Sequence, residues 1–287
     1  MNKIFFISMS LVFCLLSCSN GLNEVYEKQE GYRVIYKADT ISGGELPEDP
    51  NYYKEGDTVT VLKSSSDTAG NLYYIDGNMG YRCSAWVDRD NIYTEGSTFI
   101  MGDSDVTLIA QWTPYGIGDE GPGKGVIIYD NGSYASGWRY LESAPSLWYD
   151  SNSDGIADMS DADMTFQFWT NLVAITGSYS STIGDGLANT NILLTNYSFD
   201  AVAAFVCVYN CHVGGKTDWY LPSRDELIVM LSNYSITGMM TGPTIYYWSS
   251  YAVTATTDAY ICYYNGSPVN LPNAFTNYCY VRPIRRF

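Results

Sequence analysis

The stretch from Gly214 to Leu227 constrains the fold more than any other part of the chain; it reads Gly-Gly-Lys-Thr-Asp-Trp-Tyr-Leu-Pro-Ser-Arg-Asp-Glu-Leu. Its two leading glycines follow an apolar-periodic run and predict the end of a helix, because glycine adopts the left-handed conformation at little steric cost. Residues 219–221 are bulky and favour a half-buried strand. Ser223 and Glu226 form the S-x-x-E pattern of a capping box, which predicts the start of a second helix. The stretch therefore predicts two helices separated by a buried strand.

The chain has 287 residues, more than the usual size of one domain, so two domains of unequal size are expected. We predict a signal peptide at 1–17, a polar tether at 18–30, a first domain at 31–113, a linker at 114–124 and a second domain at 125–287. The linker is assigned because residues 113–124 are rich in glycine and proline. They include the run Gly121-Pro122-Gly123-Lys124, but no strand precedes it and no Ser or Thr follows the lysine, which argues against a phosphate-binding loop.

The first residues have the pattern of an export signal. Lys3 supplies a positive charge, and Ile4 to Leu16 form an apolar run too short to span a bilayer. The run ends in Leu15-Leu16-Ser17-Cys18, which resembles the lipobox of bacterial lipoproteins. That resemblance implies cleavage before Cys18 and lipid on its thiol and new amino group, which anchors the protein in the bacterial cell envelope, at the outer membrane, the surface or the periplasmic face. The alternative is an ordinary signal peptide followed by a chance cysteine.

The charge balance is strongly acidic, with 15 basic and 31 acidic side chains. Removal of the signal peptide takes away Lys3, so the mature side chains carry 14 − 31 = −17. Such a surface repels phosphate backbones, which excludes nucleic acid as the expected partner. The same repulsion counts against sulfated polysaccharides unless a local basic patch exists.

Between residues 31 and 113, β-branched and aromatic runs alternate with turns, which predicts strands at 32–36, 57–62 and 106–112. The segments at 52–61, 81–86, 93–99 and 103–112 together resemble one Listeria–Bacteroides repeat, of the internalin B type. The resemblance implies a small β-grasp-like module that acts as a spacer or adhesion unit, in a family for which no active site is known. The chain departs from the family pattern at Ala85, where a glycine is usual, and in a longer loop around 64–74.

The second domain is expected to mix strands with two helices. We predict strands at 126–129, 138–141, 246–250, 259–264, 268–271 and 278–282, with a hairpin turn at Asn265-Gly266. Residues 189–191 are predicted as loop. One helix is predicted from a cap at Ser198 or Asp200 to the glycine pair at 214–215, and the other from Arg224 to about Ser232.

Three segments together resemble the DUF1566 or Lcl C-terminal family. They are the stretch from Gly214 to Leu227, which we call the opening stretch, Tyr247-Trp248-Ser249-Ser250, and Val281-Arg282-Pro283-Ile284-Arg285-Arg286-Phe287. Further matches at 125–130, 138–142, 144–145 and 183–190 extend the resemblance over about residues 125–287. It implies an α+β, C-type-lectin-like fold related to the sulfatase-modifying factors. It also implies adhesion or glycan binding, since the functions known in the family lean that way.

One loop has the spacing of a calcium site. Oxygen ligands are expected at positions 1, 3, 5, 7, 9 and 12 of such a loop, with glycine at position 6. The sequence places Asp150, Asn152, Asp154, the carbonyl of Ile156, Asp158 and Asp161 at these positions. Position 12 is Asp rather than Glu, which resembles dockerin and thrombospondin-type loops. The alternative is an acidic, solvated turn.

The cysteines and the histidine of the mature chain give little support to catalysis. Beyond Cys18 there are five cysteines, Cys83, Cys207, Cys211, Cys262 and Cys279, whose connectivity the sequence leaves open. Cys262 and Cys279 lie on separate predicted strands and are one candidate pair. His212 is adjacent to Cys211, and neighbouring residues on a helix point about 100° apart, so a Cys–His pair is disfavoured.

Two surface features remain as weak ligand-binding candidates. Trp248 has the chemistry to stack on a sugar, although a buried core tryptophan is the commoner outcome. Arg282, with Arg285 and Arg286, has the chemistry to meet a carboxylate or sulfate. The alternative is that these arginines pair with local acids such as Asp225 and Glu226.

The expected function is a non-enzymatic, envelope-anchored module that binds a host glycan or matrix protein. A homo-oligomer is a further candidate assembly, and calcium is the one candidate cofactor. One alternative is an enzyme or enzyme-modifying factor, which would require an exposed thiol of low pKa. Another is a purely structural envelope protein.

Overall fold

The computed structural model describes residues 30–66, 68–149, 164–170, 174–197 and 203–287. The protein is strand-rich, with 34% strand and 14% helix, which is compatible with the expected α+β class. Residues Gly31–Phe287 form one compact unit by their contacts.

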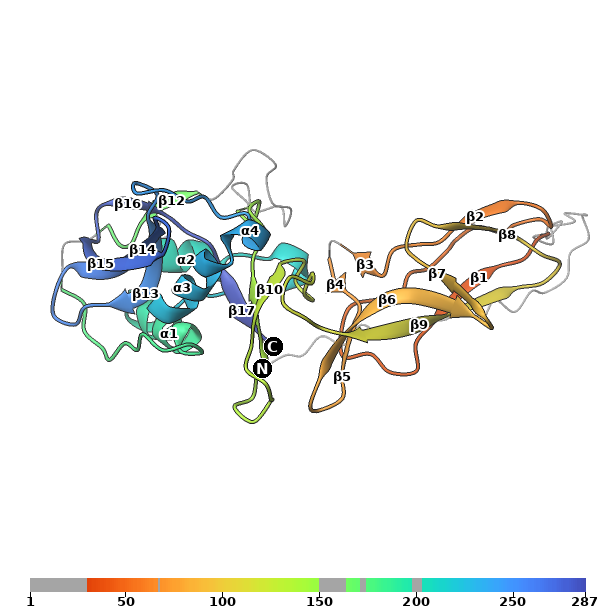
Figure 1. Ribbon diagram of the computed structural model, residues 1–287, viewed down its shortest axis with the longest axis horizontal. Helices are drawn as coiled ribbons and strands as arrows, with labels where there is room; N and C mark the ends of the chain where they lie inside the picture. The colour runs from red at the N-terminus through yellow and green to blue at the C-terminus, as the bar shows by residue number, and fades with distance from the viewer. Residues whose placement is uncertain (1–29, 67, 150–163, 171–173, 198–202) are drawn as a thin grey trace, which may run out of the picture. The chain divides into compact units, whose positions relative to one another are not determined.

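The described residues from Gly31 to Pro114 form strands and contain no helix. The strands are β1 (Val34–Lys37), β2 (Thr58–Thr60), β3 (Ser65–Ser66), β4 (Gly70–Asn71), β5 (Tyr73–Ile75), β6 (Gly80–Asp88), β7 (Asn91–Tyr93), β8 (Thr98–Ile100) and β9 (Val106–Pro114). The long strands β6 and β9 pair antiparallel, β1 pairs parallel with β9, and β5 and β7 pair with β6 (Figure 1). The strands predicted at 32–36, 57–62 and 106–112 are confirmed.

The core of this part follows from the alternation of side chains along the strands. Val34 and Tyr36 of β1, Trp86 of β6 and Leu108 of β9 are all buried in one cluster. The rings of Tyr36 and Trp86 meet edge to face with centroids 4.8 Å apart. The hydroxyl of Tyr36 accepts a hydrogen bond of 2.8 Å from the backbone N–H of Leu62. The phenol is therefore buried with its polar atom satisfied.

The segment predicted as a linker, 114–124, forms backbone hydrogen bonds with neighbouring residues. Strand β9 runs to Pro114, and the backbone N–H of Gly121 donates to the carbonyl of Gly125 at 2.9 Å. The N–H of Ile127 donates to the carbonyl of Asp119, also at 2.9 Å. Because Gly31–Phe287 forms one unit by its contacts, the domain boundary at 114–124 stays a prediction.

The remaining strands form two sheets. The first contains β10 (Val126–Asp130), β11 (Tyr140–Ser143) and β17 (Ile284–Arg286) in that order. The second has the order β12 (Thr165–Gln167), β16 (Tyr278–Tyr280), β13 (Tyr247–Ala252), β14 (Asp258–Tyr264) and β15 (Pro268–Ala274). Strands β14 and β15 form the predicted hairpin, in which Gly266 has a φ of 78°.

The helices are α1 (Gly186–Tyr197), α2 (Ala204–Tyr209), α3 (Arg224–Ser232) and α4 (Tyr234–Thr237), with a short 3₁₀ turn, η1, at Val213–Gly215. Figure 1 shows α3 beside the sheet of β13, β14 and β15, which it contacts. The helix predicted at Arg224 to Ser232 is confirmed as α3. Residues 189–191, predicted as loop, lie inside α1, so that prediction is wrong.

The glycine pair at 214–215 lies in the 3₁₀ turn η1 and does not end the longer helix that was predicted before it. Helix α2 ends earlier, at Tyr209, and both glycines take a positive φ within the turn that follows. A Cβ on Gly214 would lie 2.5 Å from the backbone of Gly123, and one on Gly215 would lie 1.8 Å from the carbonyl oxygen of Thr68. The glycines are therefore needed because other backbone segments approach them closely.

The remainder of the opening stretch folds as predicted. The backbone N–H of Glu226 donates to the side chain of Ser223 at 3.2 Å, and the N–H of Ser223 donates to the Glu226 carboxylate at 2.7 Å. This capping box begins α3. Trp219 is buried, and Tyr220 forms a β-bridge with Ile284.

Candidate functional site

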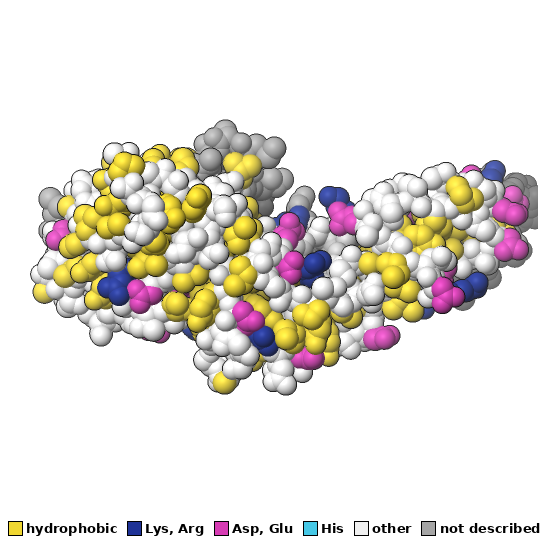
Figure 2. Space-filling view, viewed as in Figure 1, with side chains coloured by type: hydrophobic (Ala, Val, Ile, Leu, Met, Phe, Trp, Pro, Cys, Tyr) yellow, Lys and Arg dark blue, Asp and Glu magenta, His cyan; other side chains and the backbone are white. Residues whose placement is uncertain are grey.

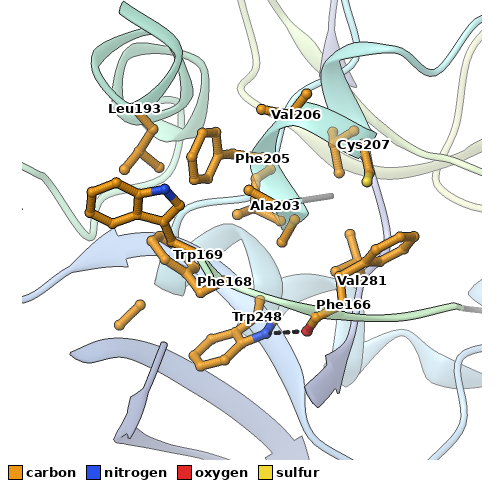
Figure 3. Packing of buried hydrophobic residues seen from close by; sticks show 14 of the residues in the cluster. Phe166, Phe168, Trp169, Leu193, Ala203, Phe205, Val206, Cys207, Trp248 and Val281 are labelled. Atoms are coloured by element: carbon orange, nitrogen blue, oxygen red, sulfur yellow. Dashed lines mark hydrogen bonds between the residues drawn. The ribbon is translucent and has the colours of Figure 1, made fainter. Parts of the chain in front are cut away.

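Trp248, predicted as a weak ligand-binding residue, lies inside the largest cluster of buried side chains. None of its surface is exposed, and its Nε1 donates to the carbonyl of Phe166 at 2.9 Å (Figure 3). Its ring meets Phe168 edge to face, with centroids 5.4 Å apart. The structure therefore gives a ligand no surface of Trp248 to stack on.

Arg282, the other predicted ligand-binding residue, is also fully buried. Its guanidinium donates to the carbonyl of Ala144 at 3.0 Å and to that of Thr237 at 2.9 Å. Buried polar groups need such partners, because water cannot supply them there. The contacts place Arg282 in the scaffold.

The predicted calcium loop, Asp150 to Asp161, and the predicted lipidation site, Cys18, lie outside the described residues and stay predictions. Among the residues that the structure describes, no group of three or more His, Cys, Asp or Glu is placed to hold a metal ion. None of the described helices is long and apolar enough to cross a membrane.

None of the five described cysteines forms a disulfide. The candidate pair is separated, because Cys262 packs in one hydrophobic cluster and Cys279 in another. Burial raises the pKa of the thiols of Cys211, Cys262 and Cys279 to about 12 and that of Cys83 to about 11. A thiol nucleophile needs a lowered pKa, so these four thiols do not support the enzyme alternative.

Cys211 and His212 do not form a catalytic pair. The thiol of Cys211 is buried and donates to the carbonyl of Trp148. The exposed ring of His212 has its Nδ1 2.7 Å from the carbonyl of Asn210. The geometry agrees with the expectation that adjacent residues here cannot act together.

Glu142 on β11 is a fully buried carboxylate held by a glycine-rich loop and by Arg285. The backbone N–H groups of Gly123 and Gly125 donate to its Oε1 at 2.9 and 2.8 Å, and Arg285 Nη1 donates to Oε2 at 2.8 Å. A Cβ on Gly123 would lie 2.8 Å from the Trp219 ring, so a side chain there would force a shift. The loop therefore holds an anion that the chain itself supplies.

Arg285 joins this carboxylate to the opening stretch. Its Nε and Nη2 donate to the two carboxylate oxygens of Asp218 at 2.7 and 2.9 Å. Burial raises the pKa of Glu142, while the charge and hydrogen bonds of Arg285 oppose that rise. We expected Asp225 and Glu226 as partners of the terminal arginines; for Arg285 the partners are Glu142 and Asp218 instead.

Glu226 is a second fully buried carboxylate, but neutral donors hold it. Its oxygens accept from the N–H of Ser223 at 2.7 Å, the N–H of Gly184 at 2.9 Å and the hydroxyl of Tyr220 at 3.1 Å. Burial raises the pKa of Glu226 to about 7. Both buried acids have their oxygens occupied by protein donors, which indicates a structural role for each.

The candidate site is a hollow between α1 and α2 that we call the helix groove. It has a volume of about 510 Å³ and is lined by Asn191, Leu194 and Thr195 from α1, and by Val206, Tyr209 and Asn210 from the end of α2. Tyr209 is 54% exposed. The groove therefore combines an accessible aromatic ring with apolar side chains and amides.

The Thr195 hydroxyl of the helix groove donates to the carbonyl of Asn191 at 2.7 Å, but other polar side chains of the groove have no such partner among the described residues. Within the described residues, the side-chain amides of Asn191 and Asn210 and the phenol of Tyr209 make no hydrogen bond to protein. In contrast, Asn189, on the other face of α1, is buried and bonded to both Ser180 and Ser250. Amides of lining residues that make no hydrogen bond within the described residues are available to a ligand with hydroxyl groups.

Sequence reasoning missed this site because it assigned part of α1 to a loop. The segment Gly186-Leu-Ala-Asn-Thr-Asn-Ile-Leu-Leu-Thr-Asn-Tyr197 is rich in Asn and Thr, which have modest helix propensity. The available signal was the spacing of Asn191, Leu194 and Thr195, at i, i+3 and i+4, which places them on one face of a helix.

The surface charge is mixed on the face that Figure 2 shows. Basic side chains there lie beside acidic ones and do not gather into a positive patch. This distribution agrees with the net charge of −16 and gives no support to a polyanion as ligand.

A scan against protein-family models and a search of curated proteins both found no match to the chain. The two family resemblances therefore rest on the sequence motifs alone.

Proposed function

We propose that the chain is a lipid-anchored protein of the bacterial envelope that binds neutral glycans, without catalysis, in the helix groove. The observation that carries the proposal is one hollow that combines the exposed ring of Tyr209, apolar side chains and two amides that make no hydrogen bond within the described residues. A sugar offers hydroxyls for the amides and a C–H face for the ring, so it matches both parts of the surface.

The proposal assigns a separate role to each part of the chain. Cys18 carries the lipid, residues 31–113 act as a β-grasp-like spacer of the Listeria–Bacteroides type, and residues 125–287 form a C-type-lectin-like module of the DUF1566 type. The strand-rich content with few helices supports this assignment, and the motifs described above motivate it. A neutral ligand is favoured because the acidic surface repels anions.

The ligand is tested with the compact unit, residues 31–287, on an array of neutral and charged glycans. We expect binding to neutral glycans, and we expect Tyr209→Ala to weaken it about tenfold, because loss of an aromatic contact costs about 1.5 kcal/mol. The matched control is Tyr278→Ala, since Tyr278 is 69% exposed and lies outside the groove. Equal binding by the two variants would exclude the groove.

Absence of binding to every glycan would leave the matrix-protein ligand or the purely structural alternative, and surface-plasmon resonance against matrix proteins would separate these two.

The lipid anchor is tested independently in the full chain. Cys18→Ser should move the protein from the membrane fraction to the soluble fraction and abolish labelling with a radioactive fatty acid. Unchanged fractionation and labelling would contradict lipidation at Cys18.

A further inference from the structure

A second hollow, of about 300 Å³, lies between the strands of residues 31–114 and the segment at Glu120, and we call it the charged pocket. Its lining includes Lys63, Ser65, Asn71, Arg82, Glu95 and Glu120. It shares no residue with the helix groove. Its two cationic and two anionic side chains distinguish it from the groove, where none of the described lining residues is charged.

Arg82 is the clearest sign that the charged pocket is not complete without a ligand. Its Nε lies 3.2 Å from Asp119 Oδ1, but this atom is buried and makes no hydrogen bond. No hydrogen bond from the guanidinium to protein occurs within the described residues. A guanidinium presents five N–H donors and usually uses them on carboxylate or phosphate groups. The guanidinium of Arg82 is ion-paired with Asp119, but within the described residues its N–H groups are not taken up by hydrogen bonds.

The other charges of the pocket are held only by exposed contacts. Lys63 Nζ lies 3.1 Å from Glu95 Oε1, and the two side chains are 72% and 43% exposed. Exposed ion pairs contribute little to stability, so a ligand can exchange partners with them at small cost. Glu120 accepts one hydrogen bond of 2.7 Å from the amide of Asn71, which leaves acceptor positions on its carboxylate free.

This arrangement selects the charge of its ligand. A simple anion would be attracted by Arg82 and Lys63 but repelled by Glu95, by Glu120 and by Asp119, which lies beside Arg82. A simple cation would be attracted by these carboxylates but repelled by Arg82 and Lys63. A neutral sugar would remove water from four charges without replacing it with opposite charge. A zwitterion satisfies both signs, and with no net charge it is not repelled by the acidic protein as a whole.

We propose that the charged pocket binds a small zwitterion, namely a free amino acid or a short peptide. Its carboxylate pairs with Arg82 and Lys63, and its ammonium group pairs with Glu95 and Glu120. The volume suits a ligand of this size, since drug-sized ligands occupy pockets of about 300–1,000 Å³. A neighbouring hollow of about 730 Å³ shares Lys63 and Ser65 and includes Ile41, Leu46 and Pro47, so a peptide can extend over apolar surface.

The test is isothermal titration calorimetry of residues 31–287 with alanine and with alanyl-alanine. Two analogues remove one charge each: N-acetyl-alanyl-alanine lacks the ammonium group, and alanyl-alanine amide lacks the carboxylate. We expect the free compounds to bind and each blocked analogue to bind at least tenfold more weakly. No heat from either free compound, or equal binding of the blocked dipeptides, would overturn the proposal.

Variants locate the site. Arg82→Gln should weaken binding of alanyl-alanine at least tenfold, whereas Lys54→Gln removes the same charge from an exposed position outside the pocket and should leave binding unchanged. Glu95→Gln gives a second reading at a partly exposed side chain if Arg82→Gln does not fold. Equal affinity of Glu95→Gln and the parent protein would exclude this pocket. Because Tyr209→Ala should not change zwitterion binding, failure here is distinguishable from failure of the glycan proposal.

Discussion

Glu142 and Glu226 are both fully buried, but the protein compensates their charges by different means. The region around Glu142 supplies a cation, Arg285, together with two glycine N–H groups. The region around Glu226 supplies only neutral donors, from Ser223, Gly184 and Tyr220. The first region therefore depends on a long-range ion pair, and the second depends on local backbone geometry. This difference determines how each region should respond to mutation and to pH.

Removal of the cation should have the largest effect. In Arg285→Met the carboxylate of Glu142 stays buried without its charge partner, and breaking a buried pair in this way costs about 3–5 kcal/mol. Urea unfolding at pH 7 would measure the loss. Lys63→Met is the matched control, because it breaks an exposed pair and should change the unfolding free energy little. The double variant Glu142→Gln with Arg285→Met should recover part of the lost stability, because it no longer buries an unpaired charge. Equal stability of Arg285→Met and Lys63→Met would show that the buried pair is unimportant.

The region around Glu226 should make the stability of the protein depend on pH. Because burial raises the pKa of Glu226 from 4.5 to about 7, its contribution to stability is fully present below about 4.5 and is lost as the pH rises through 7. The loss is about 3 kcal/mol between these values, at about 1.4 kcal/mol per unit. Glu226→Gln should remove this dependence while losing part of the helix cap. The check is the difference in unfolding free energy between the two proteins at pH 5 and at pH 8; a constant difference would contradict the raised pKa.

Calcium would offer a third way to compensate carboxylates, in the predicted loop from Asp150 to Asp161. If the loop binds calcium, a free concentration one hundred times the dissociation constant should stabilise the protein by about 2.7 kcal/mol. Thermal unfolding with and without Ca²⁺ would show this, and Asp154→Ala should abolish the shift. Titration calorimetry without heat in the parent protein would end the calcium prediction.

The smallest of these effects should come from the cap itself. Ser223→Ala removes the side chain that accepts from Glu226 N–H, and such changes cost about 1 kcal/mol. Ser232→Ala is the control, since its hydroxyl is exposed at the other end of the same helix. Equal melting temperatures of the two variants would mean that the Ser223 side chain contributes nothing to the cap of α3.

The two regions also differ in what could be predicted from the sequence. The capping box is local, because Ser223 and Glu226 are three positions apart, and both the box and the extent of α3 are confirmed. The pairing of Glu142 with Arg285 spans 143 positions, and no local pattern connects them. The glycine-rich loop was recognised at 121–124, but its anion is a side chain whose position only the folded chain determines.

Predictions for the strands were better than those for the remaining helices. Alternating runs marked β1, β2 and β9 because burial of one face imposes a period of two on the sequence. Helix α1 was missed because Asn and Thr carry little helical signal, and tertiary contacts of Asn189 with Ser180 and Ser250 compensate for that. The burial of Trp248 and Arg282 was likewise decided by packing, so the two candidate pockets had to come from the structure.

The span between Glu142 and Arg285 has a consequence for the order of folding. Bringing β17 to β11 closes a loop of 143 positions, which makes this contact slow compared with local hairpins. Before that closure an ionised Glu142 is far cheaper in water than in a dry core. We therefore expect the sheet of β10, β11 and β17 to consolidate last, after the β14–β15 hairpin and α3. Pulsed hydrogen exchange during refolding would show protection at β11 and β17 arriving together, and later than at β14.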